Sequence, residues 1–335
     1  MNPATDIIGS DRLSLFINEH RLFVLVLSSY FWVAFVILSL ANRPYRFVLM
    51  YPLFALIWGG LTAAWLAWRY LMHPRLLRAS LEPSRALGAL LVFFVAVPAQ
   101  STFQSVKKAI GPAVGFSWDP ALDQLDQLVH GGPAWMWFSS VVESPLALRA
   151  IDWLYTIWFI LLLLFIWWVS WTTRRQLRQQ AMVAFLLIWI IGGNIIAAVF
   201  ASAGPCYSSH VGVDPAPYAA LLARTQASHL FASTAQPAIW QALVEGPGLT
   251  FGGVSAFPSI HVAVAVFLAI VGWKSSRWVG IVMAVYASLI QVGSIVLGWH
   301  YAVDGYAGAI IAFACWHLAG WMTRRFGQPL LVASV

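Results

Sequence analysis

The chain alternates between long apolar stretches and short polar segments, and this pattern predicts a helical membrane protein. A membrane helix needs about 20 apolar residues, whereas the strands of a membrane barrel alternate apolar and polar positions. About eight stretches approach the helical length, at residues 22–41, 47–68, 86–104, 153–171, 181–201, 259–273, 279–297 and 303–322. The sixth is short, as expected for a helix that begins at a recessed site. We therefore expect an all-α integral membrane protein.

The composition supports this prediction, because only 9% of the 335 residues are charged and 61% are hydrophobic. A soluble domain of this size carries roughly a quarter charged residues. The net charge of +7 raises the question of nucleic acid, but the basic residues lie in short segments between apolar stretches. Such positions are typical of topology signals and of contacts with anionic lipid headgroups. We expect membrane lipids as partners and no nucleic acid.

The basic residues also predict the orientation of the chain in the membrane. Basic residues follow every second apolar stretch. Arg69, Arg75, Arg78 and Arg85 follow the second stretch, and Arg174, Arg175 and Arg178 follow the fourth. Lys274 and Arg277 follow the sixth, and Arg324 and Arg325 follow the eighth. Cytoplasmic loops are enriched in Lys and Arg, so both termini are predicted to be cytoplasmic. The loops 105–152, 202–258 and 298–302 then lie on the outer face, periplasmic or lumenal. Arg43 and Arg46, in the first outer loop, go against this rule.

The loop 105–152 is predicted to contain a short amphipathic helix that lies in the membrane interface. Asp119 is a suitable N-cap, Pro120 suits the first turn, and Gly131 or Gly132 suits the end. The apolar stripe of this helix consists of Leu122, Leu125, Leu128 and Val129. Its polar face carries Asp123, Asp126 and His130. We interpret this face as exposed to solvent, and a metal site is the alternative interpretation.

The loop 202–258 is long for a structureless connection and is predicted to form a folded cap. Residues 217–231 and 236–245 have helical patterns within it. A glycine-rich segment then leads into the sixth apolar stretch, with Gly246, Gly248, Gly252 and Gly253.

Candidate chemistry begins at Ser255-Ala-Phe-Pro258-Ser259-Ile-His261, where the sixth apolar stretch starts. Pro-Ser before an apolar run indicates a helix start with Ser259 near the N-cap. The free N–H groups and the dipole of a helix N-terminus bind phosphate. His261, in the first turn, would overhang such an anion and donate a proton to a leaving oxygen. The alternative is a capping serine beside a buried, hydrogen-bonded histidine without chemistry.

A second candidate follows the seventh apolar stretch, in Gly298-Trp-His300-Tyr-Ala-Val-Asp304. If a helix begins near Trp299, His300 and Asp304 share one of its faces. A carboxylate bound to one ring nitrogen fixes the tautomer and leaves the other nitrogen free to attack. The alternatives are a structural capping pair, or a metal site formed by His261, His300 and Asp304. A metal does not account for the Pro-Ser helix start, whereas a phosphate does.

These two segments resemble the second and third signature motifs of the type 2 phosphatidic acid phosphatase (PAP2) superfamily. Ala-Phe-Pro-Ser-Ile-His, and His-Tyr without a preceding arginine, are similar to the branch that contains inositol phosphorylceramide synthase. The resemblance to that branch extends to Asp119, Asp126, Gly131-Gly132 and Gly204-Pro205-Cys206. It covers roughly residues 90–322. It implies a two-helix membrane extension at 1–85 and a PAP2-like catalytic membrane domain at 86–325, with outer-face capping loops.

The resemblance implies a phosphohistidine mechanism that uses no metal or cofactor. His300 is the implied nucleophile, Asp304 orients it, and His261 is the implied general acid. Water then resolves the intermediate in a phosphatase, and an alcohol resolves it in a phosphotransferase. The predicted substrate is a lipid phosphate or phospholipid, and the candidate alcohol acceptors are inositol, diacylglycerol and ceramide.

Two phosphate-binding arginines of the family are missing from this chain. Gly293-Ser294 stands where Ser-Arg is expected, and Gly111-Pro112 stands nearest to an expected Arg-Pro. The candidate phosphate-binding residues are Lys107, Lys108 and Ser259, with Arg224 as a further substitute. A phosphodiester has a lower charge and needs fewer cations, which favours transfer, whereas hydrolysis is the commoner activity of the family.

A transporter or flippase that binds lipid phosphate without chemistry is the alternative function. It would use the same helix N-termini, together with charged residues that line a path through the membrane. The predicted spans carry almost no such charges. Asn194 is the one central polar residue singled out here, and we interpret it as a helix-packing residue.

Overall fold

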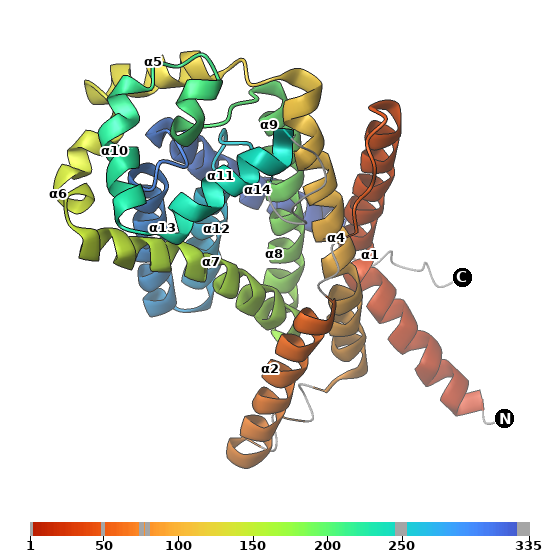
Figure 1. The fold of residues 1–335 in the computed structure, drawn as a ribbon. Helices are drawn as coiled ribbons and strands as arrows, with labels where there is room; N and C mark the ends of the chain where they lie inside the picture. The colour runs from red at the N-terminus through yellow and green to blue at the C-terminus, as the bar shows by residue number, and fades with distance from the viewer. Residues whose placement is uncertain (1–2, 48–50, 74–76, 78–80, 245–252, 327–335) are drawn as a thin grey trace.

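Long helices form a bundle, and shorter helices lie over one end of it (Figure 1). The computed structural model describes residues 3–47, 51–73, 77, 81–244 and 253–326, and the regular elements in these ranges are all helices. In order they are α1 (Pro3–Leu40), α2 (Tyr51–Met72), α4 (Pro83–Val114), α5 (Asp119–His130), η1 (Ala134–Phe138), α6 (Ser139–Val142), α7 (Pro145–Trp171), α8 (Arg175–Leu187), η2 (Ile188–Ile196), α9 (Ala197–Val199), η3 (Pro205–His210), α10 (Ala216–Ala227), α11 (Phe231–Val244), α12 (Ile260–Ser275), α13 (Arg277–Val296) and α14 (Ala302–Phe326).

Seven helical segments in the described ranges are long and apolar enough to cross a membrane: α1, α2, α4, α7, the continuous run from α8 to α9, α13 and α14. The shorter apolar helix α12 coincides with the short sixth apolar stretch of the sequence. The prediction of an all-α, multi-pass integral membrane protein is therefore confirmed.

Several helices extend beyond the apolar stretches that predicted them. α4 continues to Val114 instead of ending near residue 104, and α7 begins at Pro145 instead of near residue 153. Backbone hydrogen bonds continue where side chains become polar, so an apolar stretch marks only the part of a helix that lies in lipid. The outer loop is therefore shorter than predicted, and Lys107 and Lys108 lie within α4.

α12 lies at the centre of the bundle and packs against α13 and α14. A helix that is apolar on every face is buried on every face. Its buried residues include Val262, Ala263, Val264, Ala265 and Phe267. This central position fixes where the first turn of α12 lies, and that turn carries the candidate chemistry.

α5, α10 and α11 lie over one end of the bundle, which we call the cap end (Figure 1). Asp126 of α5 accepts a hydrogen bond from the backbone N–H of Val303 in α14 (3.2 Å). Gln236 of α11 donates one to the Leu297 carbonyl just after α13 (2.8 Å). The segment after Ser202 contains α10 and α11 and contacts the bundle through Gln236, while its prediction as a cap stays a prediction. Most of the glycine-rich segment before Gly253 lies outside the described residues, as do Arg75 and Arg78.

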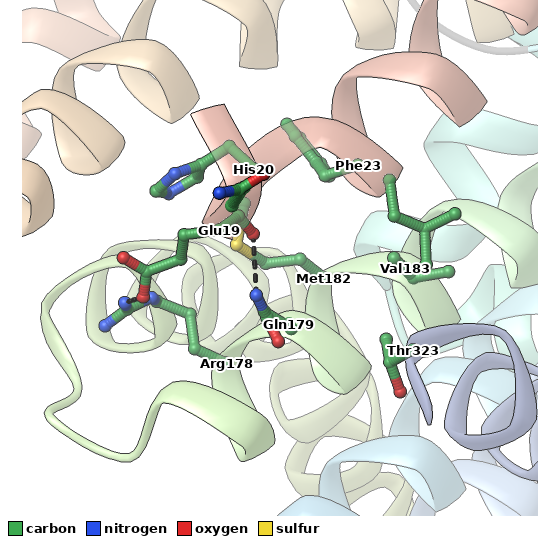
Figure 2. A pocket seen from close by; sticks show the side chains of 10 residues that line it. Glu19, His20, Phe23, Arg178, Gln179, Met182, Val183 and Thr323 are labelled. Carbon is green, nitrogen blue, oxygen red and sulfur yellow. Dashed lines mark hydrogen bonds and ion pairs between the residues drawn. The ribbon is translucent and has the colours of Figure 1, made fainter. Parts of the chain in front are cut away.

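A buried ion pair joins α1 to the bundle (Figure 2). The Arg178 guanidinium of α8 lies against the Glu19 carboxylate of α1, and only 5% and 4% of these side chains are exposed. Gln179 also donates a hydrogen bond to the Glu19 carbonyl (2.8 Å). The sequence identified Arg178 only as a topology signal, and the structure adds a fixed role between α1 and α8. Asn194, in η2, accepts a hydrogen bond from Tyr30 of α1 (2.5 Å), which agrees with helix packing.

Removal of the Glu19 charge should destabilise the protein. In a Glu19→Gln variant the Arg178 charge stays buried without its counter-charge, which costs about 3 kcal/mol or more. The measurement is the thermal unfolding midpoint in detergent, with Glu143→Gln as the control because Glu143 is exposed. Equal midpoints for the two variants would show that the ion pair contributes nothing.

Candidate active site

Two histidine rings from distant parts of the chain lie close together at the cap end. His261 is in the first turn of α12, and His300 lies just before α14. Their ring centroids are 6.5 Å apart. Ser259 is the N-cap of α12, as predicted, and its Oγ accepts from the backbone N–H of Val262 (3.4 Å). The two segments that the sequence singled out therefore form one site.

Asp304 holds one side of the His300 ring. Its Oδ2 lies 3.3 Å from Nδ1 of His300 and also accepts from the backbone N–H of Tyr301 (3.1 Å). α14 begins at Ala302, close to the predicted start of the eighth apolar stretch, so His300 lies before the helix and the Asp304 carboxylate points back toward it. A proton on Nδ1 directed at this carboxylate leaves a lone pair on Nε2. The contact thus selects the tautomer that a nucleophile needs.

The surroundings of His300 keep its imidazole neutral. Burial lowers the pKa of His300 to about 3; the charge of Lys107 acts in the same direction, and a backbone hydrogen bond with Ala256 opposes it. A histidine with this pKa is unprotonated from about pH 4 upward. The ring therefore has its lone pair at every physiological pH, and a fall in activity near the ordinary histidine pKa is not expected from this group.

Ser259 links the starts of α12 and α14. Its backbone N–H donates to the Asp304 carbonyl (2.9 Å), and its side chain is fully buried. Gly308 of α14 faces the same place, where an added Cβ would lie 2.4 Å from the Ser259 carbonyl oxygen. Ser259 therefore fixes the two histidine segments relative to each other, while its predicted contact with phosphate stays a prediction.

The lysine pair lies beside this site, in the C-terminal half of α4. Lys107 is within electrostatic range of both His261 and His300. Gly253 packs between the two lysines, because a Cβ there would lie 3.2 Å from Cγ of Lys107 and 3.3 Å from Cγ of Lys108. Arg224 is exposed on α10. Among the predicted phosphate-binding cations, Lys107 is thus the one whose charge reaches both rings.

Aromatic side chains of α7 enclose His261. The Tyr155 ring stacks on the imidazole with centroids 4.7 Å apart, and the Trp158 ring lies at 4.4 Å. Phe159 meets the imidazole edge-on at 5.8 Å, and Trp158 donates a hydrogen bond to the His261 carbonyl (3.1 Å). These contacts fix the orientation of the ring, while His261 itself stays partly exposed. The sequence analysis did not identify these residues, because aromatic residues at helical spacing also occur on faces that contact lipid.

Asp119 connects α5 to the site, and its prediction as a helix cap is wrong. The N-cap position is Trp118, and the Asp119 carboxylate instead accepts from the backbone N–H groups of Ala203 (2.7 Å) and Gly204 (2.8 Å). Tyr301, the neighbour of His300, donates to the same carboxylate (3.3 Å). Burial raises the pKa of Asp119 to about 6, against the effect of these hydrogen bonds. The sequence pattern around Asp119 predicted a helix cap, whereas the hydrogen-bond partners of its carboxylate are distant in the sequence.

The polar face of α5 is buried, so the prediction of a solvated face is wrong for two of its three residues. Asp126 and His130 are 2% and 7% exposed, and His130 is hydrogen-bonded to the Asp126 carbonyl (2.7 Å) and to Tyr306 (3.0 Å). Leu128 and Val129 face outward instead. An outward apolar face suits a helix at the membrane interface, where lipid replaces water. Within the described residues, no group of three His, Cys, Asp or Glu residues is arranged to hold a metal ion.

The segment from Ser202 to Cys206 lies between the two histidine segments. The Ser202 carbonyl accepts from Ala256 (2.8 Å), and the backbone N–H of Cys206 donates to the Gly298 carbonyl (2.9 Å). Gly204 has φ 97° and ψ 170°, a region open essentially to glycine alone. A Cβ on Gly204 would lie 2.4 Å from the backbone oxygen of Trp299. This segment sets the spacing between the two rings.

A Gly204→Ala substitution should therefore lower both stability and turnover. The strained backbone and the clash cost about 2 kcal/mol or more, and relief of the clash displaces the segment that carries His300. The measurements are the unfolding midpoint and the turnover of a lipid phosphate, the substrate class predicted from the sequence. Gly59→Ala is the control, because a Cβ there meets nothing within 4 Å. Turnover equal to the control would contradict the proposed spacing role.

Comparison with known proteins agrees with this geometry. The family model described as the PAP2 superfamily matches residues 120–318, more than half of the chain. The match includes both histidine segments and leaves out α1, α2 and α4. No curated protein and no solved structure matches the chain. By the family match, this chain belongs to the PAP2 superfamily.

Proposed function

We propose that this protein is a membrane enzyme that hydrolyses or transfers the phosphoryl group of a lipid phosphate or phospholipid through a phosphohistidine intermediate. The pair of rings carries the proposal: His261 and His300 lie 6.5 Å apart, with Asp304 on one nitrogen of His300. Membership of the PAP2 superfamily supports phosphatase or phosphotransferase chemistry.

In the first step, the Nε2 lone pair of His300 attacks phosphorus, and the bond from phosphorus to the leaving oxygen breaks. Asp304 holds the Nδ1 proton and offsets the positive charge that develops on the ring. His261, which takes up a proton when the negatively charged substrate binds, gives this proton to the leaving oxygen. In the second step, water or an alcohol attacks phosphorus and loses its proton to His261. The phosphorus–nitrogen bond breaks, and both histidines return to their starting states.

The cap bears on the choice between water and an alcohol. α10 and α11 cover the end of the bundle at which the rings lie, and exclusion of water is a physical requirement for transfer. The likeness of the motifs to the inositol phosphorylceramide synthase branch suggests inositol, diacylglycerol or ceramide as acceptor. By the positive-inside rule, we propose that the cap end faces the periplasm or lumen and that both termini are cytoplasmic.

The deciding experiment offers the purified protein a phospholipid or a lipid phosphate together with diacylglycerol, ceramide or inositol. Free phosphate indicates hydrolysis, and a new lipid indicates transfer.

We expect turnover to survive EDTA; loss with EDTA and rescue by zinc would contradict the metal-free mechanism. If the protein moves labelled lipid across a vesicle bilayer and forms no product from any substrate, it is a transporter instead.

A further inference from the structure

The hydroxyl group of Tyr155 is a buried donor beside the candidate active site, and the steps proposed above do not use it. The Tyr155 side chain belongs to a residue that is only 7% exposed. Its hydroxyl oxygen is buried and forms no hydrogen bond with any residue that the structure describes. Buried side-chain polar atoms nearly always have a partner, and an exception at a functional site often trades stability for activity. A ligand is therefore a natural partner for this hydroxyl.

The Tyr155 ring lies between the segments that hold the two histidines. It stacks on His261, with ring centroids 4.7 Å apart and an interplanar angle of 22°. On α13, a Cβ added to Gly293 would lie 3.1 Å from Cδ2 of Tyr155, so the backbone of α13 packs against the ring. The next residue, Ser294, accepts a hydrogen bond from the backbone N–H of His300 (3.0 Å). Tyr155 thus contacts one catalytic candidate directly and lies beside the backbone that anchors the other.

The Tyr155 side chain is directed toward the cap end. Side chains of a helix lean toward its N-terminus, and the N-terminal half of α7 contacts the start of α11. There, Asp152 accepts from the backbone N–H groups of Phe231 (2.7 Å) and Ala232 (3.2 Å). Cys206, which is partly exposed, is within electrostatic range of Tyr155. Because the hydroxyl oxygen itself is covered, a ligand reaches it by displacing neighbouring side chains.

A phosphoryl group suits this donor, because phosphoryl oxygens are strong acceptors and hydrogen bonds to charged acceptors are stronger than neutral ones. Two other donors near the rings are used within the protein: the Ser294 hydroxyl donates to a carbonyl of its own helix (2.8 Å), and Trp158 donates to the His261 carbonyl (3.1 Å). We propose that the Tyr155 hydroxyl donates a hydrogen bond to a phosphoryl oxygen of the bound substrate. This role rests on the proposed function, which places the phosphoryl group between the two rings.

The test compares Tyr155→Phe with Tyr286→Phe, which removes the same hydroxyl from a neighbouring tyrosine. Tyr286 donates to the Leu154 carbonyl (3.0 Å), so its hydroxyl has a structural partner. Full-length protein in phosphatidylcholine nanodiscs is titrated calorimetrically with octylphosphonate, which has a phosphoryl group but no leaving oxygen. The unfolding midpoint without ligand and kcat/KM with a lipid phosphate are measured on the same preparations.

The two variants should show opposite patterns. Tyr155→Phe should bind octylphosphonate about tenfold more weakly than the parent, with a loss of at least about tenfold in kcat/KM. Its unfolding midpoint should equal or exceed that of the parent, because the lost hydroxyl has no partner among the described residues. Tyr286→Phe should bind like the parent and unfold at a lower temperature, because it loses a hydrogen bond within the protein.

Equal binding of octylphosphonate by Tyr155→Phe and the parent would overturn the proposal. A midpoint of Tyr155→Phe as low as that of Tyr286→Phe would do so as well, since it would assign the hydroxyl a structural role, and so would a parent that does not bind octylphosphonate. The binding comparison needs no turnover. If the parent binds octylphosphonate but converts no lipid phosphate, the proposed function fails, and the binding by Tyr155→Phe still decides the role of the hydroxyl.

Discussion

A His300→Ala variant should lose at least about 10³-fold in turnover of lipid phosphate, because His300 forms the covalent intermediate in the proposed mechanism. The ring that it removes is buried, neutral and held by Asp304 at 3.3 Å. The variant should still fold, since α12 and α14 remain joined through the hydrogen bond from Ser259 to the Asp304 carbonyl. The measurement is initial rate in detergent, with the unfolding midpoint recorded on the same sample.

The matched control is His317→Ala, which removes an exposed histidine from the outer surface of α14. Its turnover should equal that of the unmodified protein. If His300→Ala retains turnover within about tenfold of this control while it stays folded, His300 is not the nucleophile.

A His261→Ala variant should lose about 10²–10⁴-fold with alkyl phosphates, and its loss should depend on the leaving group. An alkoxide needs a proton as it leaves, whereas the phenolate of an aryl phosphate leaves without one. The variant should therefore retain far more activity on para-nitrophenyl phosphate than on a lipid phosphate. This pattern separates a general acid from a residue that only fills space among Tyr155 and Trp158.

The comparison needs both substrates on the same preparation, with His317→Ala again as control. An equal loss with aryl and alkyl substrates would assign His261 a packing role and leave the leaving group without an acid.

The membrane architecture was predictable because one strong signal determines it. Hydrocarbon tolerates few polar residues, so the apolar stretches located the seven described helices that are long enough to cross a membrane, and also the shorter α12. The helix ends were less predictable, since α4 and α7 continue into polar sequence. The short helix α5 was also located correctly from its proline and glycine, although its inward face was misjudged.

The histidine segments were predictable because their signals are local: a Pro-Ser helix start before His261 and a carboxylate near His300. The contacts around them were not. Asp119 accepts hydrogen bonds from the backbone N–H groups of Ala203 and Gly204, and Asp126 accepts one from that of Val303. Every residue type except proline has a backbone N–H group, so the sequence does not show which residues donate these bonds. Only the folded chain shows which distant backbone segment a carboxylate reaches.

The central claim is that His300 carries the phosphoryl group, and its most direct measurement is mass spectrometry of the protein quenched during turnover. A lipid phosphate is mixed with the enzyme and quenched in alkali, in which a phosphorus–nitrogen bond survives. The account predicts one phosphoryl group on the peptide that contains His300, and none in the His300→Ala variant. A phosphoryl group on another residue, or turnover with no protein-bound phosphate at any quench time, would contradict it.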